Sequence, residues 1–184
     1  MQPWYNSRKA AQIAAFFAMR EGGNIPALKV VKLIYLAERS FMDAYEASML
    51  NDQLVSMEHG PVNSITLNRI NGSGDDGREW AEFVTDREFH RISVANKVMT
   101  EEALDELSRA ELKVLGSTWD KFGHMDQWEI RNYTHDHCPE WEDPDFSSHP
   151  IPYSRVFKFL GKENPEELDK RIQRERTIDA LLNS

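Results

Sequence analysis

The sequence predicts a mainly α-helical fold: a compact single domain built around a buried central helix, with a small β-hairpin. Two observations predict it. The stretch from Leu28 to Phe41 is apolar over most of a helical circumference, and several other segments begin with residues that cap helices. In addition, 184 residues suit one domain that buries roughly 70 % of the surface exposed by its unfolded chain.

The central helix is predicted from Pro26 to about Tyr45. Pro26 suits the first turn of a helix because its missing N–H donor would be unused there, and Gly22-Gly23 ends the preceding helix. At about 1.5 Å per residue this helix would be about 30 Å long, the diameter of a small domain. A helix that is apolar around most of its surface is normally buried, so we expect the neighbouring helices to pack around it.

Further helices are predicted from their caps and their apolar spacing. The first begins at Asn6 or Ser7 and runs to about Arg20, and it folds back on the central helix as an antiparallel partner. A proline at the first helical position and two acids follow a capping residue at the start of the last helix, expected over about 165–182. The others are expected over about 62–70, 108–122, 126–133 and 153–160.

The small β element is predicted between Trp80 and Val94. Apolar residues lie on two short segments, 80–84 and 89–94, separated by Asp86-Arg87, which is typical of a hairpin. Gly60-Pro61 is predicted instead to open a short helix, because glycine permits an unusual backbone angle and proline is tolerated in a first helical turn.

The charge favours a protein partner over a nucleic acid. Asp and Glu number 31 against 22 Lys and Arg, a formal net charge of −9, whereas contact with phosphate backbones depends on Lys and Arg. We therefore expect a basic partner and no direct nucleic-acid contact. One cysteine, Cys138, and no charged-then-apolar leader indicate a cytoplasmic protein, and no apolar run is long enough for a membrane span.

The region around Cys138 is the one candidate for chemistry. The possible zinc donors are His124, His135, His137, Cys138 and His149. However, His135 and His137, two apart, cannot share a helix face, and no second pair stands at zinc-finger spacing. No hydrolase motif surrounds them. We therefore expect no catalytic residue and no cofactor, and a small metal-dependent hydrolase remains the alternative from another class.

Residues 126–145 combine acids with large aromatic side chains. Such a stretch can form a contact surface for a basic protein, because rings supply buried area and acids supply steering. Alternatively, the rings belong to the core and the acids only keep the outer face solvated. Seven acids and one basic residue, Arg131, lie in this stretch, and the interleaved rings are Trp128, Tyr133, Trp141 and Phe146.

The order of several short motifs resembles the Panacea domain, a phage-associated family that is also called the SocA-like antitoxin domain. The first helix contains Ala11, Ala14 and Phe17. Lys32-Leu33-Ile34-Tyr35-Leu36-Ala37, Gly60-Pro61-Val62 and Thr134-His135 follow, with Trp141 downstream. The similarity runs from about residue 8 to about residue 160, so we expect one such domain over 1–184, with its core at about 8–160.

The resemblance implies an antitoxin that neutralises a small toxin, encoded next to it, by direct protein contact. One branch of the family is implicated in delivering its toxin to a cellular protease. Some relatives carry a DNA-binding segment, for which this chain has no spare basic helix. A phage protein that binds a host factor is an alternative with the same sequence features. The candidate partner-binding residues are Tyr35, His59, Trp128, Tyr133, His135, Glu140, Trp141, Glu142 and Asp143.

Overall fold

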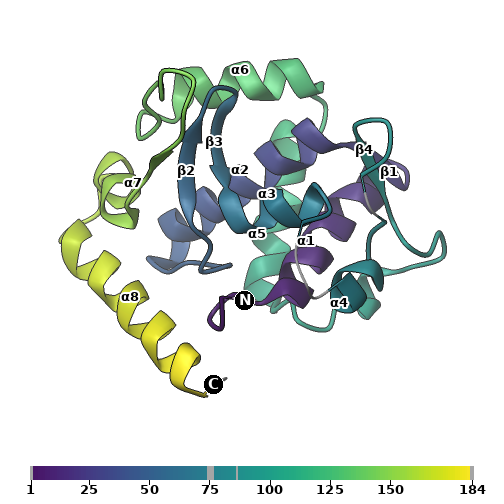
Figure 1. Cartoon of the computed structure of the whole chain (residues 1–184), viewed down its shortest axis with the longest axis horizontal. Coiled ribbons are helices and arrows are strands. Elements are labelled where there is room, and N and C mark those ends of the chain that lie inside the picture. Colours follow the sequence, from purple (N-terminus) through teal and green to yellow (C-terminus); the bar gives the residue numbers. More distant parts are fainter. Residues whose placement is uncertain (1, 74–76, 86, 183–184) are drawn as a thin grey trace.

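The central helix is α2 (Ala27–Tyr45), one residue shorter at its start than predicted. The computed structural model describes residues 2–73, 77–85 and 87–182. In Figure 1, α2 runs through the middle of the molecule. Its apolar residues from Val30 to Ala37 are all at most 5 % exposed, as the sequence predicts for a helix apolar around most of its surface.

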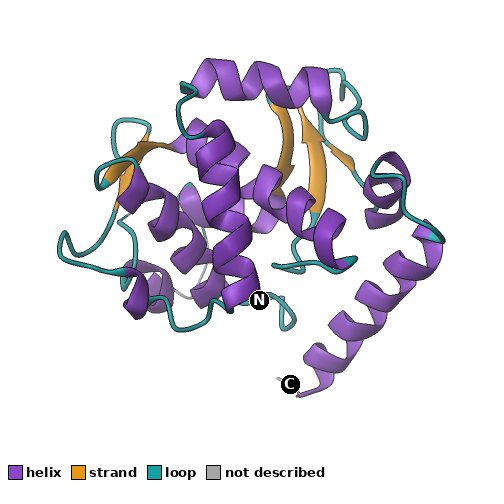
Figure 2. Ribbon diagram, turned by 180° about the vertical axis from the view of Figure 1, so that it is seen from behind, coloured by secondary structure: helices purple, strands orange, loops and turns teal. Residues whose placement is uncertain are grey.

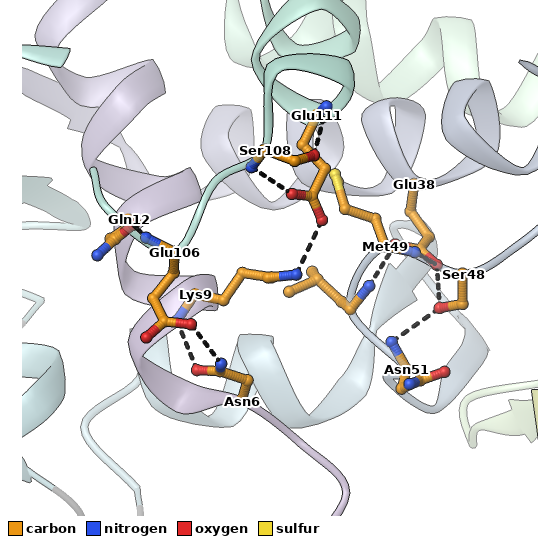
Figure 3. A network of polar contacts seen from close by, with 11 residues as sticks. Asn6, Lys9, Gln12, Glu38, Ser48, Met49, Asn51, Glu106, Ser108 and Glu111 are labelled. Atoms are coloured by element: carbon orange, nitrogen blue, oxygen red, sulfur yellow. Dashed lines mark hydrogen bonds and ion pairs between the residues drawn. The ribbon is translucent and has the colours of Figure 1, made fainter. Parts of the chain in front are cut away.

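Helices α1 (Ser7–Arg20) and α5 (Arg109–Phe122) both pack against α2 and against each other. Asn6 caps α1 by accepting a hydrogen bond from the Lys9 amide, as predicted. Ser108 and Glu111 form a reciprocal capping box at the start of α5. The Glu111 carboxylate also accepts a bond from the Lys9 ammonium at 2.9 Å, which joins the first turns of the two helices (Figure 3).

Helix α6 (Gln127–His137) also packs on α2 and crosses the upper edge of the molecule in Figure 1. Asp126 accepts bonds from the amides of Trp128 and Glu129, and the Glu129 carboxylate accepts a bond from the Asp126 amide. This second capping box fixes where α6 starts. The predicted start at Asp126 is therefore confirmed.

Two small antiparallel sheets flank the helices. In one, β1 (Asn24–Pro26) pairs with β4 (Arg91–Ser93). In the other, the strand order is β3-β2-β5, with β2 (Leu54–Met57) in the centre, β3 (Gly60–Asn63) on one side and β5 (His149–Pro150) on the other. The β2 and β3 strands form a hairpin whose turn is Glu58-His59, and Figure 2 shows both beneath α6.

The two segments predicted as a hairpin, 80–84 and 89–94, are joined only in part. Antiparallel bridges link Val84 with Val94 and Glu88 with Arg91, but Trp80 belongs to a short helix, α4 (Gly77–Ala81), and the regular pairing of β4 is with β1. The regular hairpin lies at 54–63, outside the predicted range. Of the apolar residues that suggested alternation, Phe89 is 87 % exposed and the others are buried, and Asp86 lies outside the described residues.

The prediction that Gly60-Pro61 opens a helix is also wrong. Both residues belong to β3, and the helix that follows, α3 (Ser64–Ile70), begins three residues after Pro61. Gly60 has a φ of +94°, which a residue with a side chain rarely adopts, and this angle lets the chain turn back from β2 into β3.

The remaining elements cover the periphery. They are the short η1 turn (Glu101–Ala103), α7 (Tyr153–Phe159) and α8 (Pro165–Leu182), whose bounds match the predicted last helix. Helix α8 packs mainly on α7 and extends along one side of the molecule in both views (Figures 1 and 2). None of the helices in the described ranges combines the length and the apolar character that crossing a bilayer requires.

A buried carboxylate connects α2 to the chain that follows it. The Glu38 carboxylate is fully buried and accepts hydrogen bonds from the Ser48 hydroxyl and from the amides of Met49 and Leu50 (Figure 3). Burial raises the pKa of Glu38 to about 7, against the effect of these three donors. The segment between α2 and β2 is thus held on α2 by a group that titrates near neutral pH.

We expect Glu38 to make the folded state less stable as pH rises. Between its ordinary value of 4.5 and its folded pKa of about 7, the folded state binds a proton that the unfolded state has released. The stability of wild-type protein relative to Glu38→Gln should therefore fall by about 2 kcal/mol as pH rises from about 5 to about 8. Urea unfolding of both proteins at both pH values measures this. A difference that is the same at both pH values would contradict the assignment.

Candidate functional site

A buried ion pair holds the loop after α6 against the central helix. The Glu140 carboxylate is 0 % exposed and accepts hydrogen bonds from the Tyr35 hydroxyl at 2.7 Å and the Arg39 Nε at 2.8 Å. Burial raises the pKa of Tyr35 well above its ordinary value, so its hydroxyl stays protonated and donates. The loop therefore has one fixed position on α2.

The next residue, Trp141, joins this loop to α6 and to β2. Its indole ring stacks on the His135 ring with centroids 4.3 Å apart, and its Nε1 donates to the Met57 carbonyl at 2.9 Å. The Glu142 amide donates to the Ser56 hydroxyl of the same strand. Residues 140–142 thus contact α2, α6 and β2.

Gly60 packs closely against α6 and α2. A side chain at this position would place its first carbon 2.8 Å from the Thr134 hydroxyl, 3.0 Å from the His135 ring and 3.1 Å from the Lys32 ammonium. Glycine is therefore required here both for its backbone angle and for the space. The stretches Lys32-Leu33, Gly60-Pro61 and Thr134-His135, far apart in the chain, meet at this point.

Lys32 is part of the same junction. Its side chain is fully buried, and its ammonium donates to the Pro61 carbonyl at 3.0 Å. Burial lowers the pKa of Lys32 to about 7. Burial and the nearby Lys32 charge also lower the pKa of His135, which favours a neutral imidazole next to the lysine.

The outer side of this junction is exposed and acidic. We define the α6 face as the exposed side chains of residues 126–146 together with the turn Glu58-His59. Two aromatic side chains project from it, Trp128 at 52 % exposure and Phe146 at 95 %. Of the seven acids in this stretch, Glu140 is buried and the other six are exposed, namely Asp126, Glu129, Asp136, Glu142, Asp143 and Asp145.

The candidate partner-binding residues divide into three groups. Tyr35 and Glu140 are fully buried, so they can only position other residues. His135 and Trp141 are half-buried and stacked on each other, and Tyr133 is half-buried between the rings of Phe122 and His137. Those that the structure leaves exposed are His59, Trp128, Glu142 and Asp143.

The possible zinc donors do not converge. The His135 ring faces Trp141, whereas the His137 ring stacks on Tyr133 at 4.2 Å. Cys138 is 1 % exposed, and burial raises its pKa to about 12, which disfavours a reactive thiolate. Within residues 2–73, 77–85 and 87–182, no three His, Cys, Asp or Glu side chains are grouped to hold a metal ion. The geometry therefore gives the hydrolase alternative no support.

Comparison with protein families identifies the chain. A family model described as "Antitoxin SocA-like, Panacea domain" matches residues 30–142. The chain belongs to this family. The matched range starts within α2 and ends at Glu142. It contains Lys32, Gly60 and Thr134, whose meeting point we call the Panacea junction, and also the buried Glu140. Comparison with curated proteins and with solved structures gives no significant match.

Several residues that shape the α6 face could not be identified from the sequence. Arg39 and Lys32 were not expected to position it, although both stand on the buried helix, where a charged side chain signals a specific partner. Phe146 was noted only as part of the acidic stretch. It is 95 % exposed in a loop where its φ is +65°, and no pattern in the sequence reveals that.

Gly60→Ala should destabilise the protein far more than Gly22→Ala. Both glycines have φ near +90°, but nothing lies within 4 Å of a side chain added at Gly22. The two substitutions therefore share the backbone cost and differ in the contacts with Thr134 and His135. We expect Gly60→Ala to lower the free energy of unfolding by at least about 2 kcal/mol more, measured by urea unfolding. Equal losses would contradict the close packing of Gly60 on α6.

Proposed function

We propose that this chain is an antitoxin that neutralises a small basic toxin by direct, non-enzymatic contact through its α6 face. Membership of the Antitoxin SocA-like family supports the antitoxin role. The observation that carries the mechanism is the exposure of Trp128 and Phe146 among six exposed acids. Exposed aromatic side chains supply buried area on association, and surrounding acids steer a basic partner into place.

The fixed position of the α6 face supports the same proposal. A surface that is ordered before binding loses less conformational entropy when its partner docks. Glu140 anchors the loop from within, and the capping box at Asp126 fixes the start of α6, close to Trp128. We propose that the toxin meets a largely preformed surface.

The expected partner is the product of the adjacent gene, and the expected compartment is the cytoplasm. The free and buried Cys138 fits a reducing environment. Occlusion of a toxin requires no reacting group in this chain, which agrees with the lack of convergence among His135, His137 and Cys138.

The purified protein should form a stable complex with the product of the adjacent gene. Replacing Glu142 and Asp143 together by lysine should then slow association about tenfold at low salt and weaken its salt dependence, because two of the six exposed acids become cations and the steering field is weakened. Stopped-flow or biosensor kinetics at several salt concentrations measure both effects. Glu140 must stay unchanged, since its carboxylate is buried in an ion pair.

The matched control is the pair Glu163→Lys and Glu167→Lys. Both glutamates are exposed and lie just before or within α8, and Glu167 forms an exposed ion pair with Lys170 as Glu142 does with Arg155. This variant has the same change in net charge, so it should reduce the association rate much less. Two proteins that elute separately at micromolar concentration would overturn the proposed function. Equal slowing by the two variants would remove Glu142 and Asp143 from the mechanism.

A further inference from the structure

A groove of about 560 Å³ opens beside the start of α6. It lies between the first turns of α2, the β2–β3 hairpin, the turn at 87–90 and the residues Gln127 and Trp128. Its apolar lining comes from α2, β2, β3 and α3, and the buried Lys32 also lines it. The apolar residues are Ala27, Leu28, Val31, Met57, Val62 and Leu67. An open apolar floor of this size can accommodate a bulky apolar side chain of another molecule.

The rim of this groove differs in charge from the rest of the α6 face. Arg87, His59 and His90 line it, and Glu58 is its one acid among the described lining residues. The Arg87 guanidinium donates to the Asn71 side-chain oxygen at 2.6 Å and contacts the Nδ1 of His90 at 2.7 Å. No carboxylate among the described residues pairs with Arg87. The rim therefore presents an oriented cation in a protein of net charge −9.

The neighbouring groups add to this positive character. A guanidinium can only donate hydrogen bonds, so the Nδ1 of His90 accepts and the ring proton lies on Nε2, where it is available as a donor. The first turn of α2, including Ala27 and Leu28, lines the same groove, and its N-cap residue Pro26 provides no side-chain cap. The positive end of the α2 dipole therefore lies at the groove.

The turn that carries Arg87 and His90 is fixed to α2. Glu88 and Arg91 exchange two backbone hydrogen bonds of 2.9 Å across it, and the His90 carbonyl accepts a bond from the Ala27 amide at 2.8 Å. Trp128, half exposed at the start of α6, also lines the groove. The lining of the groove thus contains both a cation and an aromatic ring.

We propose that this groove binds a segment of the partner protein in which a bulky apolar side chain is adjacent to a carboxylate. The apolar side chain would occupy the floor next to Trp128, and the carboxylate would accept hydrogen bonds from Arg87 and His90. This identification of the occupant rests on the proposed function, because the partner is the toxin. A basic toxin that also carries this acidic element meets two surfaces of opposite sign, which fixes its orientation on the α6 face.

Two fluorescent probes test the chemistry of the groove without the toxin. Anilinonaphthalene sulfonate combines aromatic rings with an anion, and phenylnaphthylamine has similar rings without the charge. We expect the wild-type protein to bind the anionic probe at least about fivefold more tightly than the neutral one, because a charged hydrogen bond adds to apolar burial. Equal affinities would overturn the proposal that the occupant carries an anion.

Two exposed residues provide the variants. Arg87→Gln should weaken binding of the anionic probe about fivefold and leave the neutral probe unchanged, whereas Trp128→Ala should weaken both. The matched controls are Arg109→Gln and Phe159→Ala, which replace an exposed arginine and a 48 % exposed aromatic outside the groove. If the control substitutions weaken probe binding as much as the groove substitutions do, the probes bind elsewhere and the inference is overturned.

The complex with the toxin separates this inference from the proposed function. Arg87→Glu should weaken the toxin complex at least about tenfold, while Arg109→Glu should leave it nearly unchanged. A toxin that binds wild type and Arg87→Glu equally would overturn the inference and leave the proposed function standing. Absence of any wild-type complex would overturn the proposed function, and the probe titrations would still decide what the groove binds.

Discussion

The position of the α6 face depends on one buried carboxylate. Glu140 has no exposed surface; its charge is balanced by Arg39, and it also accepts a hydrogen bond from the neutral Tyr35 hydroxyl, both residues lying on the central helix. A buried charge is costly unless it is paired and hydrogen-bonded, and removal of one partner of such a pair typically costs about 3–5 kcal/mol. This interaction ties residues 138–142 to α2, and through Trp141 it also fixes α6 and β2.

The Panacea junction separates the residues that build the scaffold from those that face solvent. Lys32, Gly60 and Thr134 meet in the interior, although they are distant in the chain. Each part of the junction has a structural requirement. Gly60 leaves no space for a side chain, the Lys32 ammonium needs the Pro61 carbonyl as its acceptor, and the His135 ring next to it is favoured in its neutral form. The exposed residues nearby, such as Trp128 on α6 and Asp143 in the loop that follows it, meet no such demand.

Local signals in the sequence predicted the helices well. The caps at Asn6, Ser108 and Asp126 act within one helical turn, and the apolar run of α2 directly predicts a buried helix. Strand β1 was not predicted because its pairing with β4 joins distant residues, such as Ile25 with Ile92. The β2–β3 hairpin is local, but β3 begins with Gly60-Pro61, which is typical of a turn or a helix start. Of the candidate site, the acidic and aromatic stretch was predicted, but its division into a buried Glu140 and exposed neighbours was not. That division depends on Arg39, about a hundred residues earlier in the chain.

The central claim is that an internally fixed α6 face, rather than a reactive pocket, carries the activity of this Panacea protein. Hydrogen–deuterium exchange of the free protein and of its complex with the adjacent gene product tests it most directly. The account predicts slower exchange in the complex at residues 57–60 and 126–146, with α1 and α5 unchanged. Slower exchange confined to α1, α4 or α8 would contradict it.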